Sequence, residues 1–248
     1  MGRTQEELKR AERDYEERLI GAFPISQKRI MTVIQRHASN HATLAWYENL
    51  KTNLLTRHLD KPIKTILFTS TAQGDGTSTT VVNFATSLVK ETELRVLLVD
   101  ANLRTPCLHE AFGVDQTRGL SDLLLKVGDM ASRMNKIGAT NLYVMPCGGK
   151  HSSPVTLFES TLFDKFLQET RACFDFVILD APPATSFSEA RVICHKVDGV
   201  VLVLGSGTTR RQVALKAKRQ IEEAGGKVLG VVLNRREFHI PTWIYERL

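Results

Sequence analysis

The sequence predicts an α/β fold with a doubly wound, mostly parallel sheet and a helical extension at the N-terminus. Six short runs of β-branched and other apolar residues alternate with segments long enough to form helices. The runs are apolar almost throughout, which is typical of strands in a parallel sheet that is covered on both faces. They are residues 65–70, 95–100, 141–146, 175–182, 199–205 and 227–234.

Length and composition favour one sizeable soluble domain with small appendages. The chain has 248 residues, of which 42% are hydrophobic and 24% charged, enough to bury a core. No apolar run approaches the roughly 18 residues of a membrane span, and the charged residues from Arg3 onward differ from a secretory leader. The four cysteines are scattered and form no CxxC pair, so we expect buried free thiols in a reducing cytoplasm.

The residues before the first strand predict an N-terminal helical and basic extension over 1–42 and a main domain over 43–248. Residues 4–20 contain oppositely charged pairs at helical spacing and a thin apolar stripe, which predicts an exposed helix. A second helix is expected over 43–57, after a basic connector. The main domain would therefore begin with a helix that leads into the first strand.

The loop after the first strand has the composition of a phosphate-binding loop. Gly74, Asp75 and Gly76 lie between a buried strand and a helix that is expected to begin around Thr77–Ser78. Successive backbone N–H groups and the positive end of a helix converge at such a place, which suits a phosphate. Two glycines alone also fit an ordinary turn, but the Ser-Thr-Thr that follows favours the phosphate loop. A Walker A loop has a Lys immediately before the Ser, whereas this chain has Thr77 there.

Carboxylates follow two other predicted strands. Asp100 ends the second run and is followed by Asn102 and Arg104, and Asp180 ends the fourth run. A single Asp at a strand end is usually a helix cap. Carboxylates that gather at the carboxyl edge of a parallel sheet, beside a phosphate loop, are where Mg²⁺ is normally held.

The basic residues concentrate in two flanks of the chain. Residues 24–64 carry seven basic and two acidic side chains, and residues 209–248 carry nine basic and four acidic ones. A solvated basic face explains this pattern, and so does a surface that faces anionic lipid or an acidic partner. No basic stripe interleaved with aromatic residues is present, so nucleic acid is not expected as a partner.

The order of these motifs resembles the cytoplasmic kinase domain of bacterial tyrosine kinases, from about residue 43 to the C-terminus. This family includes CpsD/CapB and Wzc-like proteins of capsule and exopolysaccharide biosynthesis, within the ParA/MinD-related P-loop group. The resemblance therefore implies a fold of the P-loop NTPase type. The matching segments are a modified Walker A (70–79), LLVDANLRTP (97–106), GLSDLLLKVGDM (119–130), NLYVMPCGG (141–149), VILDAPP (177–183), VDGVVLVLGSGTTR (197–210) and VLGVVLNR (228–235).

The resemblance implies a role for each matching residue. Residues 74–79 (Gly74, Asp75, Gly76, Thr77, Ser78 and Thr79) would cradle the phosphates of ATP or ADP. Ser78, Asp100 and Asp180 would hold Mg²⁺, and Asp100, Asn102 and Arg104 would occupy the catalytic positions. Asn234 would contact the base, although a residue that only turns the chain at a strand end fits equally well. The implied partner is a membrane polysaccharide co-polymerase or chain-length regulator.

Four departures from the family pattern bear on activity. Thr77 replaces the Walker A Lys, and Asn102 replaces the second Asp of the second Walker motif, so it cannot accept a proton as a carboxylate can. The helix of ring-forming members has Glu, Arg and Arg where this chain has Ala45, Glu48 and Lys51. Only Tyr245 stands where active kinases carry a C-terminal tyrosine cluster. Phosphoryl transfer depends on positioning and charge neutralisation, so these losses should lower its rate by orders of magnitude.

Three functions follow as hypotheses. The first is a nucleotide-binding regulator of exopolysaccharide biosynthesis, cytoplasmic and peripheral at the inner face of the membrane, with weak or no catalysis. It would act as a homo-oligomer or together with an active kinase. The second is an active tyrosine autokinase with an atypical Walker A and Tyr245 as its phosphosite. The third is a ParA/MinD-like positioning ATPase, against which stands Ala72 in place of that group's Lys.

Overall fold

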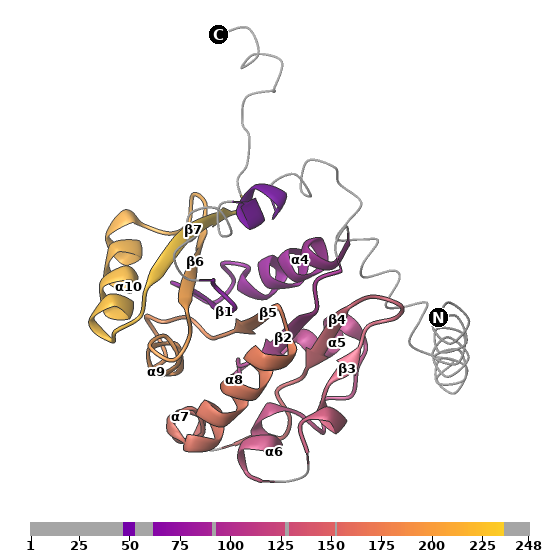
Figure 1. Ribbon diagram of the computed structural model, residues 1–248. Helices are drawn as coiled ribbons and strands as arrows, with labels where there is room; N and C mark the ends of the chain where they lie inside the picture. The colour runs from indigo at the N-terminus through magenta and orange to yellow at the C-terminus, as the bar shows by residue number, and fades with distance from the viewer. Residues whose placement is uncertain (1–46, 53–61, 91–92, 127–128, 152, 236–248) are drawn as a thin grey trace, which may run out of the picture.

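A seven-stranded sheet forms the centre of the computed structural model, which describes residues 47–52, 62–90, 93–126, 129–151 and 153–235. The strand order is β3-β4-β2-β5-β1-β6-β7, and all neighbours are parallel except β3 and β4 (Figure 1). The strands are β1 (Thr65–Ser70), β2 (Val96–Asp100), β3 (Asn135–Lys136), β4 (Leu142–Met145), β5 (Phe176–Asp180), β6 (Gly199–Gly205) and β7 (Val228–Asn234).

The predicted doubly wound α/β fold and its six strand runs are confirmed. Strand β3 was not predicted, because two residues are too short to form a pattern. It arises from antiparallel pairing of Asn135 with Val144 and of Lys136 with Tyr143. A short antiparallel edge strand of this kind is common on an otherwise parallel sheet.

Helices cover both faces of the sheet, and each face has its own core. One core takes side chains such as Leu67 and Leu179 from the sheet and packs them against α6 to α10. The other takes Ile66 and Phe68 and packs them against α4 and α5. The helices are α4 (Thr77–Lys90), α5 (Leu108–Phe112), α6 (Leu120–Leu124), α7 (Pro154–Glu159), α8 (Thr161–Cys173), α9 (Glu189–Ile193) and α10 (Arg211–Glu223), with a 3₁₀ turn, η1, at Ala131–Arg133.

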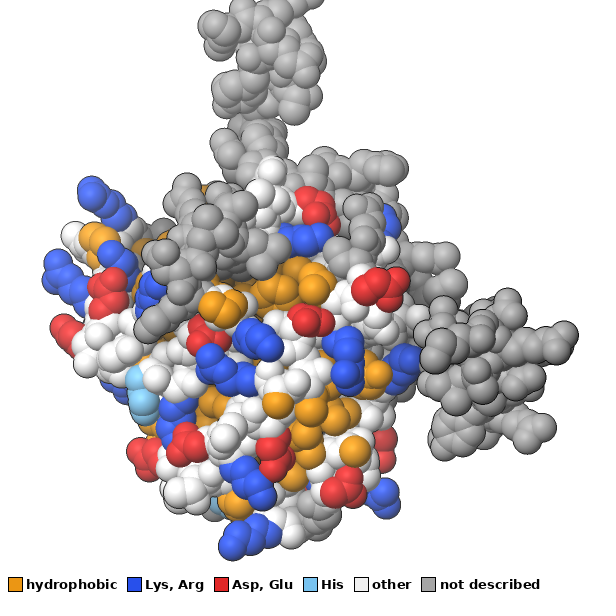
Figure 2. Space-filling model, in the orientation of Figure 1, with side chains coloured by type: hydrophobic (Ala, Val, Ile, Leu, Met, Phe, Trp, Pro, Cys, Tyr) orange, Lys and Arg blue, Asp and Glu red, His pale blue; other side chains and the backbone are white. Residues whose placement is uncertain are grey.

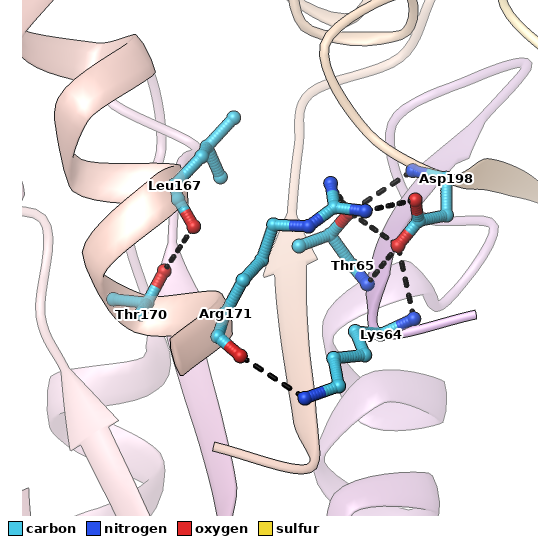
Figure 3. Close-up of polar contacts among 6 residues, drawn as sticks. All are labelled: Lys64, Thr65, Leu167, Thr170, Arg171 and Asp198. Carbon is cyan, nitrogen blue, oxygen red and sulfur yellow. Dashed lines mark hydrogen bonds and ion pairs between the residues drawn. The ribbon is translucent and has the colours of Figure 1, made fainter. Parts of the chain in front are cut away.

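A polar cluster fixes the amino edge of the sheet, opposite the predicted site (Figure 3). The Asp198 carboxylate accepts hydrogen bonds from the backbone N–H groups of Lys64 (2.9 Å) and Thr65 (2.8 Å), and it pairs with Arg171 at the end of α8. The Lys64 ammonium group in turn donates to the Arg171 carbonyl. Burial alone would raise the pKa of Asp198, but these donors outweigh it and lower the pKa. The cluster thus ties the starts of β1 and β6 to α8.

Several predictions concern residues near or beyond the limits of the part of the chain that the structure describes. Residues 47–52 are helical, as the helix over 43–57 requires, and Glu48 pairs with Lys51 at 3.4 Å. The helix over 4–20, the boundary at 42/43, Ala45 and Tyr245 lie outside the described residues. Among the helices that are described, none is long and apolar enough to cross a membrane.

The thiol prediction is correct in part. All four cysteines are free, and Cys147 and Cys194 are buried. The expectation that all are buried is wrong, because Cys173 is exposed and Cys107 is half-buried. Cys173 is the last residue of α8, where its side chain lies on the solvent side of an amphipathic helix.

Candidate nucleotide-binding site

The loop between β1 and α4 depends on its two glycines. Gly74 and Gly76 have φ values of +91° and +88°, which other residues adopt only with strain. A Cβ at Gly76 would also collide with the side-chain amide of Asn234, whereas a Cβ at Gly74 would meet no atom within 4 Å. The sequence therefore requires Gly76 both for its backbone angle and for space.

Asp75 braces this loop from within. Its buried carboxylate accepts hydrogen bonds from the backbone N–H groups of Thr71 (3.1 Å) and Ala72 (2.8 Å) and from the Thr71 hydroxyl (2.7 Å). Its carbonyl accepts a hydrogen bond from the Asn234 amide at 3.0 Å. The side chains of Asp75 and Asn234 thus fix the shape of the loop. Both make their hydrogen bonds within the protein.

The first turn of α4 presents Thr77, Ser78 and Thr79. Thr77 and Ser78 are half-buried, and Thr79 is exposed. The first N–H groups of a helix lack partners within the helix, so this turn offers donors to an anion. The sequence from Thr65 to Val89 contains no Lys or Arg, so the loop and the first turns of α4 supply donors without a mobile cation.

Asp100 and Asp180 lie directly opposite each other at the ends of β2 and β5, and both are fully buried. Asp100 accepts three hydrogen bonds, from the backbone N–H groups of Asn102 (3.2 Å), Cys107 (3.1 Å) and Leu108 (3.1 Å). Burial raises the pKa of Asp100 to about 6, against the lowering effect of those three donors. The three backbone donors therefore hold the Asp100 carboxylate in one orientation.

Asp180 is the least satisfied side chain of the site. Neither of its carboxylate oxygens has a hydrogen-bond partner among the described residues. Burial first, and the charge of Asp100 second, raise its pKa well above the usual value, while the Ser78 hydroxyl lowers it. A divalent cation would relieve two adjacent buried carboxylates, and the Ser78 hydroxyl is a suitable third oxygen ligand.

The fit to Mg²⁺ therefore rests on two carboxylates and a hydroxyl. In the part of the chain that the structure describes, no group of three or more His, Cys, Asp and Glu residues is placed to hold a metal. Mg²⁺ commonly takes one or two carboxylates and completes its shell with water and phosphate oxygens. The orphaned oxygens of Asp180 match that donor set.

Three comparisons with known proteins bear on this site. The ParA family model, described as "NUBPL iron-transfer P-loop NTPase", matches residues 62–244. The tyrosine-protein kinase YwqD of Bacillus subtilis is 33% identical over 77% of this chain and 80% of its own length. The tyrosine-protein kinase CpsD of Streptococcus agalactiae is 30% identical over 81% of this chain and 86% of its own. The chain belongs to the bacterial tyrosine kinase family. It carries the ParA-type P-loop NTPase domain.

Solved structures agree with this assignment. The CapA2B2 chimera is 29% identical, with a TM-score of 0.74 over 77% of this chain and 84% of that one. A complex of the septum site-determining protein MinD from Pyrococcus horikoshii with Mg-ADP shares the fold, with 22% identity and a TM-score of 0.59 over 74% of this chain and 76% of that one. The predicted membership of this family and the predicted P-loop fold are thus confirmed.

Two positions of the second Walker motif of this kinase family are engaged in structural contacts. The Asn102 amide donates to the Thr105 hydroxyl at 3.1 Å and accepts from the Thr105 N–H at 3.1 Å, so it closes a turn. Arg104 donates to Glu189 at 2.7 Å and lies 5.3 Å from the centre of the Phe187 ring. These contacts hold Arg104 between the segments that follow β2 and β5.

The kinase fold also brings in residues that sequence analysis missed. Thr209 lies 3.2 Å from the Thr71 hydroxyl and 3.5 Å from an Asp75 oxygen, and Thr185 donates to the Thr71 carbonyl. Helix α10 begins at Arg211, and nothing in the local sequence before it indicates the contact of Thr209 with the loop. These residues come together because β5 and β6 lie on either side of β1 in the sheet.

Proposed function

We propose that this protein is a kinase-like nucleotide-binding regulator of exopolysaccharide or capsule biosynthesis, with weak or no kinase activity. The observation that carries the proposal is the charge of the site. Two buried carboxylates lie beside a phosphate loop that has Thr77 in place of a Lys. Arg104 is the basic residue of the second Walker motif, and it is paired with Glu189.

The backbone cradle supports ATP or ADP as the ligand. Residues 74–79 would surround the phosphates, and Ser78, Asp100 and Asp180 would hold Mg²⁺, which neutralises phosphate charge when it is bound. Asn234 would act on the nucleotide through the loop, because its amide holds the Asp75 carbonyl. Without a Lys, the chain itself supplies only dipoles to the β- and γ-phosphates, so we expect weak binding.

Asn102 supports the weak-catalysis part of the proposal. A carboxylate in its place could accept the proton of a tyrosine hydroxyl, whereas an amide cannot. Asp100 remains available as a charged group, but its two oxygens are occupied by three backbone N–H groups. These features favour a protein that senses nucleotide over one that transfers phosphate.

A membrane polysaccharide co-polymerase is the proposed partner, with the protein in the cytoplasm at the inner face of the membrane. Its relatives are kinases such as CpsD and the putative kinase CapB of Staphylococcus aureus. We infer assembly with copies of itself or with an active kinase. Residues 1–42 would form an extension of the 43–248 domain that is available for such contacts.

An active autokinase that uses Tyr245 is the second candidate. The paired Asp100 and Asp180 favour it, because both carboxylates expected at a phosphoryl-transfer site are present. Such a kinase requires a cation that the phosphate loop itself does not supply. Phosphotyrosine formed by the native protein alone would support this candidate over the regulator.

Restoring the missing groups tests the proposal. A Lys makes charge-assisted hydrogen bonds worth about 1.5–3 kcal/mol, so Thr77→Lys should tighten ATP binding roughly 10- to 150-fold. Thr77→Gln, which adds length without charge, is the matched control and should not. Thr77→Lys combined with Asn102→Asp should produce phosphotyrosine where the native protein produces none. Equal affinities for the Lys and Gln variants would contradict the proposed cause.

A further inference from the structure

Helix α10 and the edge strand β7 leave apolar side chains in contact with solvent. Val213 and Leu215 on α10 are 38% and 43% exposed, and Val231 and Leu233 on β7 are 50% and 58% exposed. Only Ala217 and Ile221 of α10 are buried. We call residues 210–235 the α10–β7 surface. Exposed apolar side chains mark a contact surface where they lie together, whereas single ones are normal on a solvated face.

The apolar residues of both elements lie on one side of the sheet. Val231 and Leu233 pair in register with Leu202 and Leu204 of β6, so they project from the same face as these neighbours. That face carries the core in which the inner side of α10 is packed. Helix α10 contacts β7, and Val231 and Leu233 of that strand remain exposed.

Basic side chains surround these apolar residues. Residues 210–235 contain seven Lys and Arg against two Glu, and all seven basic residues are exposed. On α10, Arg211, Lys218 and Arg219 stand four before, three after and four after Leu215, which places them around it on the helix surface. Lys218 also pairs with Glu222 at 3.4 Å, and Val213 lies on the opposite flank of the helix. Figure 2 shows Lys and Arg side chains beside exposed hydrophobic ones where α10 lies.

We propose that the α10–β7 surface binds an anionic lipid bilayer. Exposed Leu and Val side chains enter the boundary between headgroups and acyl chains, while Lys and Arg reach the anionic headgroups. Each basic residue near such a surface contributes roughly fivefold to the partition constant. A membrane can take up both kinds of side chain at once, because its headgroups are anionic and its acyl chains are apolar.

This surface adjoins the candidate nucleotide site. Thr209, two residues before α10 begins, contacts Asp75 and Thr71 of the phosphate loop. Contact with lipid would thus place the edge of the phosphate site close to the membrane. The inference goes beyond the proposed regulation, and vesicle binding needs no nucleotide.

Co-sedimentation of the full-length protein with vesicles, in the absence of nucleotide, tests the proposal. The protein should pellet with phosphatidylglycerol vesicles and stay in solution with phosphatidylcholine vesicles, and added salt should release it. Replacing Arg211, Lys218 and Arg219 by Glu should weaken binding at least about 100-fold, because three favourable charges are reversed. Leu215→Ser should weaken it about fivefold.

Matched variants at the opposite end of the sheet are the controls. Arg118→Glu, Lys126→Glu and Lys150→Glu together change the net charge equally, and Leu125→Ser removes a Leu that is 49% exposed. These variants should bind phosphatidylglycerol vesicles far better than the α10 variants. Equal losses in both sets, or no binding by the native protein, would overturn the proposal. Nucleotide binding measured on the same samples shows whether the proposed function fails separately.

Discussion

Asp180→Asn should stabilise the protein at neutral pH, although it removes a proposed metal ligand. The carboxylate of Asp180 is fully buried and its two oxygens have no hydrogen-bond partner among the described residues. The isosteric amide therefore loses no such contact and removes a group that resists ionisation in its buried place. Active sites often hold such destabilising groups because function requires them.

The size of the effect follows from the neighbouring carboxylate. Raising the pKa of Asp100 from 3.8 to about 6 costs about 3 kcal/mol of stability at neutral pH. Asp180 is as deeply buried and also faces the charge of Asp100, so ionising it likewise costs stability. A carboxyl group whose pKa is raised in the folded state favours folding only below its pKa in the unfolded chain. This contribution to stability is lost as the pH rises through the folded-state pKa. The gain from Asp180→Asn should therefore grow from about pH 4 upward.

Urea unfolding in EDTA at pH 5 and pH 8 measures this difference. We expect the variant to exceed the native protein in unfolding free energy by about 1 kcal/mol or more at pH 8, because a buried charge without a partner costs more than a buried neutral polar group, and by less at pH 5. Asp198→Asn is the control of opposite sign. The pKa of Asp198 is lowered in the folded protein. Its contribution to stability is therefore present above its pKa in the unfolded chain and is lost only as the pH falls through its pKa in the folded protein. An Asp180→Asn variant that is no more stable than the native protein at pH 8 would refute the reasoning.

Two further predictions concern the loop and the second Walker motif. Gly76→Ala should cost more stability than Gly74→Ala, because both positions have positive φ but only a Cβ at Gly76 collides with Asn234. The φ strain alone costs about 1–2 kcal/mol. Thermal melts compare the two variants, and equal losses would count against a tight loop. Arg104→Lys should keep the charge but lose the geometry of the contact with Glu189, and it should lower the unfolding free energy by about 1 kcal/mol. An unchanged unfolding free energy in urea would show that the pair does not stabilise the fold.

The sheet could be predicted from the sequence because its strands are buried on both faces. Runs such as 199–205 are apolar throughout, and every residue of β6 is buried. The same reasoning placed Gly76, Asp100 and Asp180 at one edge, since parallel strands end together. Strand β3 left no pattern, because its two residues are held only by pairing with β4.

The directions of side chains at the site could not be predicted. Whether Asp75 turns into the loop or toward a ligand depends on Thr71 beside it and on Thr209, which is distant in sequence. Glu189 pairs with Arg104 across 85 positions of the chain, and no motif links them. Local sequence therefore predicted which residues gather at the edge, while tertiary contacts decide which of them remain available to a ligand.

Calorimetric titration of the native full-length protein with ATP and ADP, with and without Mg²⁺, tests the central claim most directly. The same samples should be probed for phosphotyrosine. We expect weak nucleotide binding and no phosphotyrosine, because the phosphate loop keeps its backbone donors and lacks a cation. Micromolar, Mg²⁺-dependent binding accompanied by phosphotyrosine that Asp100→Ala abolishes would contradict it and identify an active kinase.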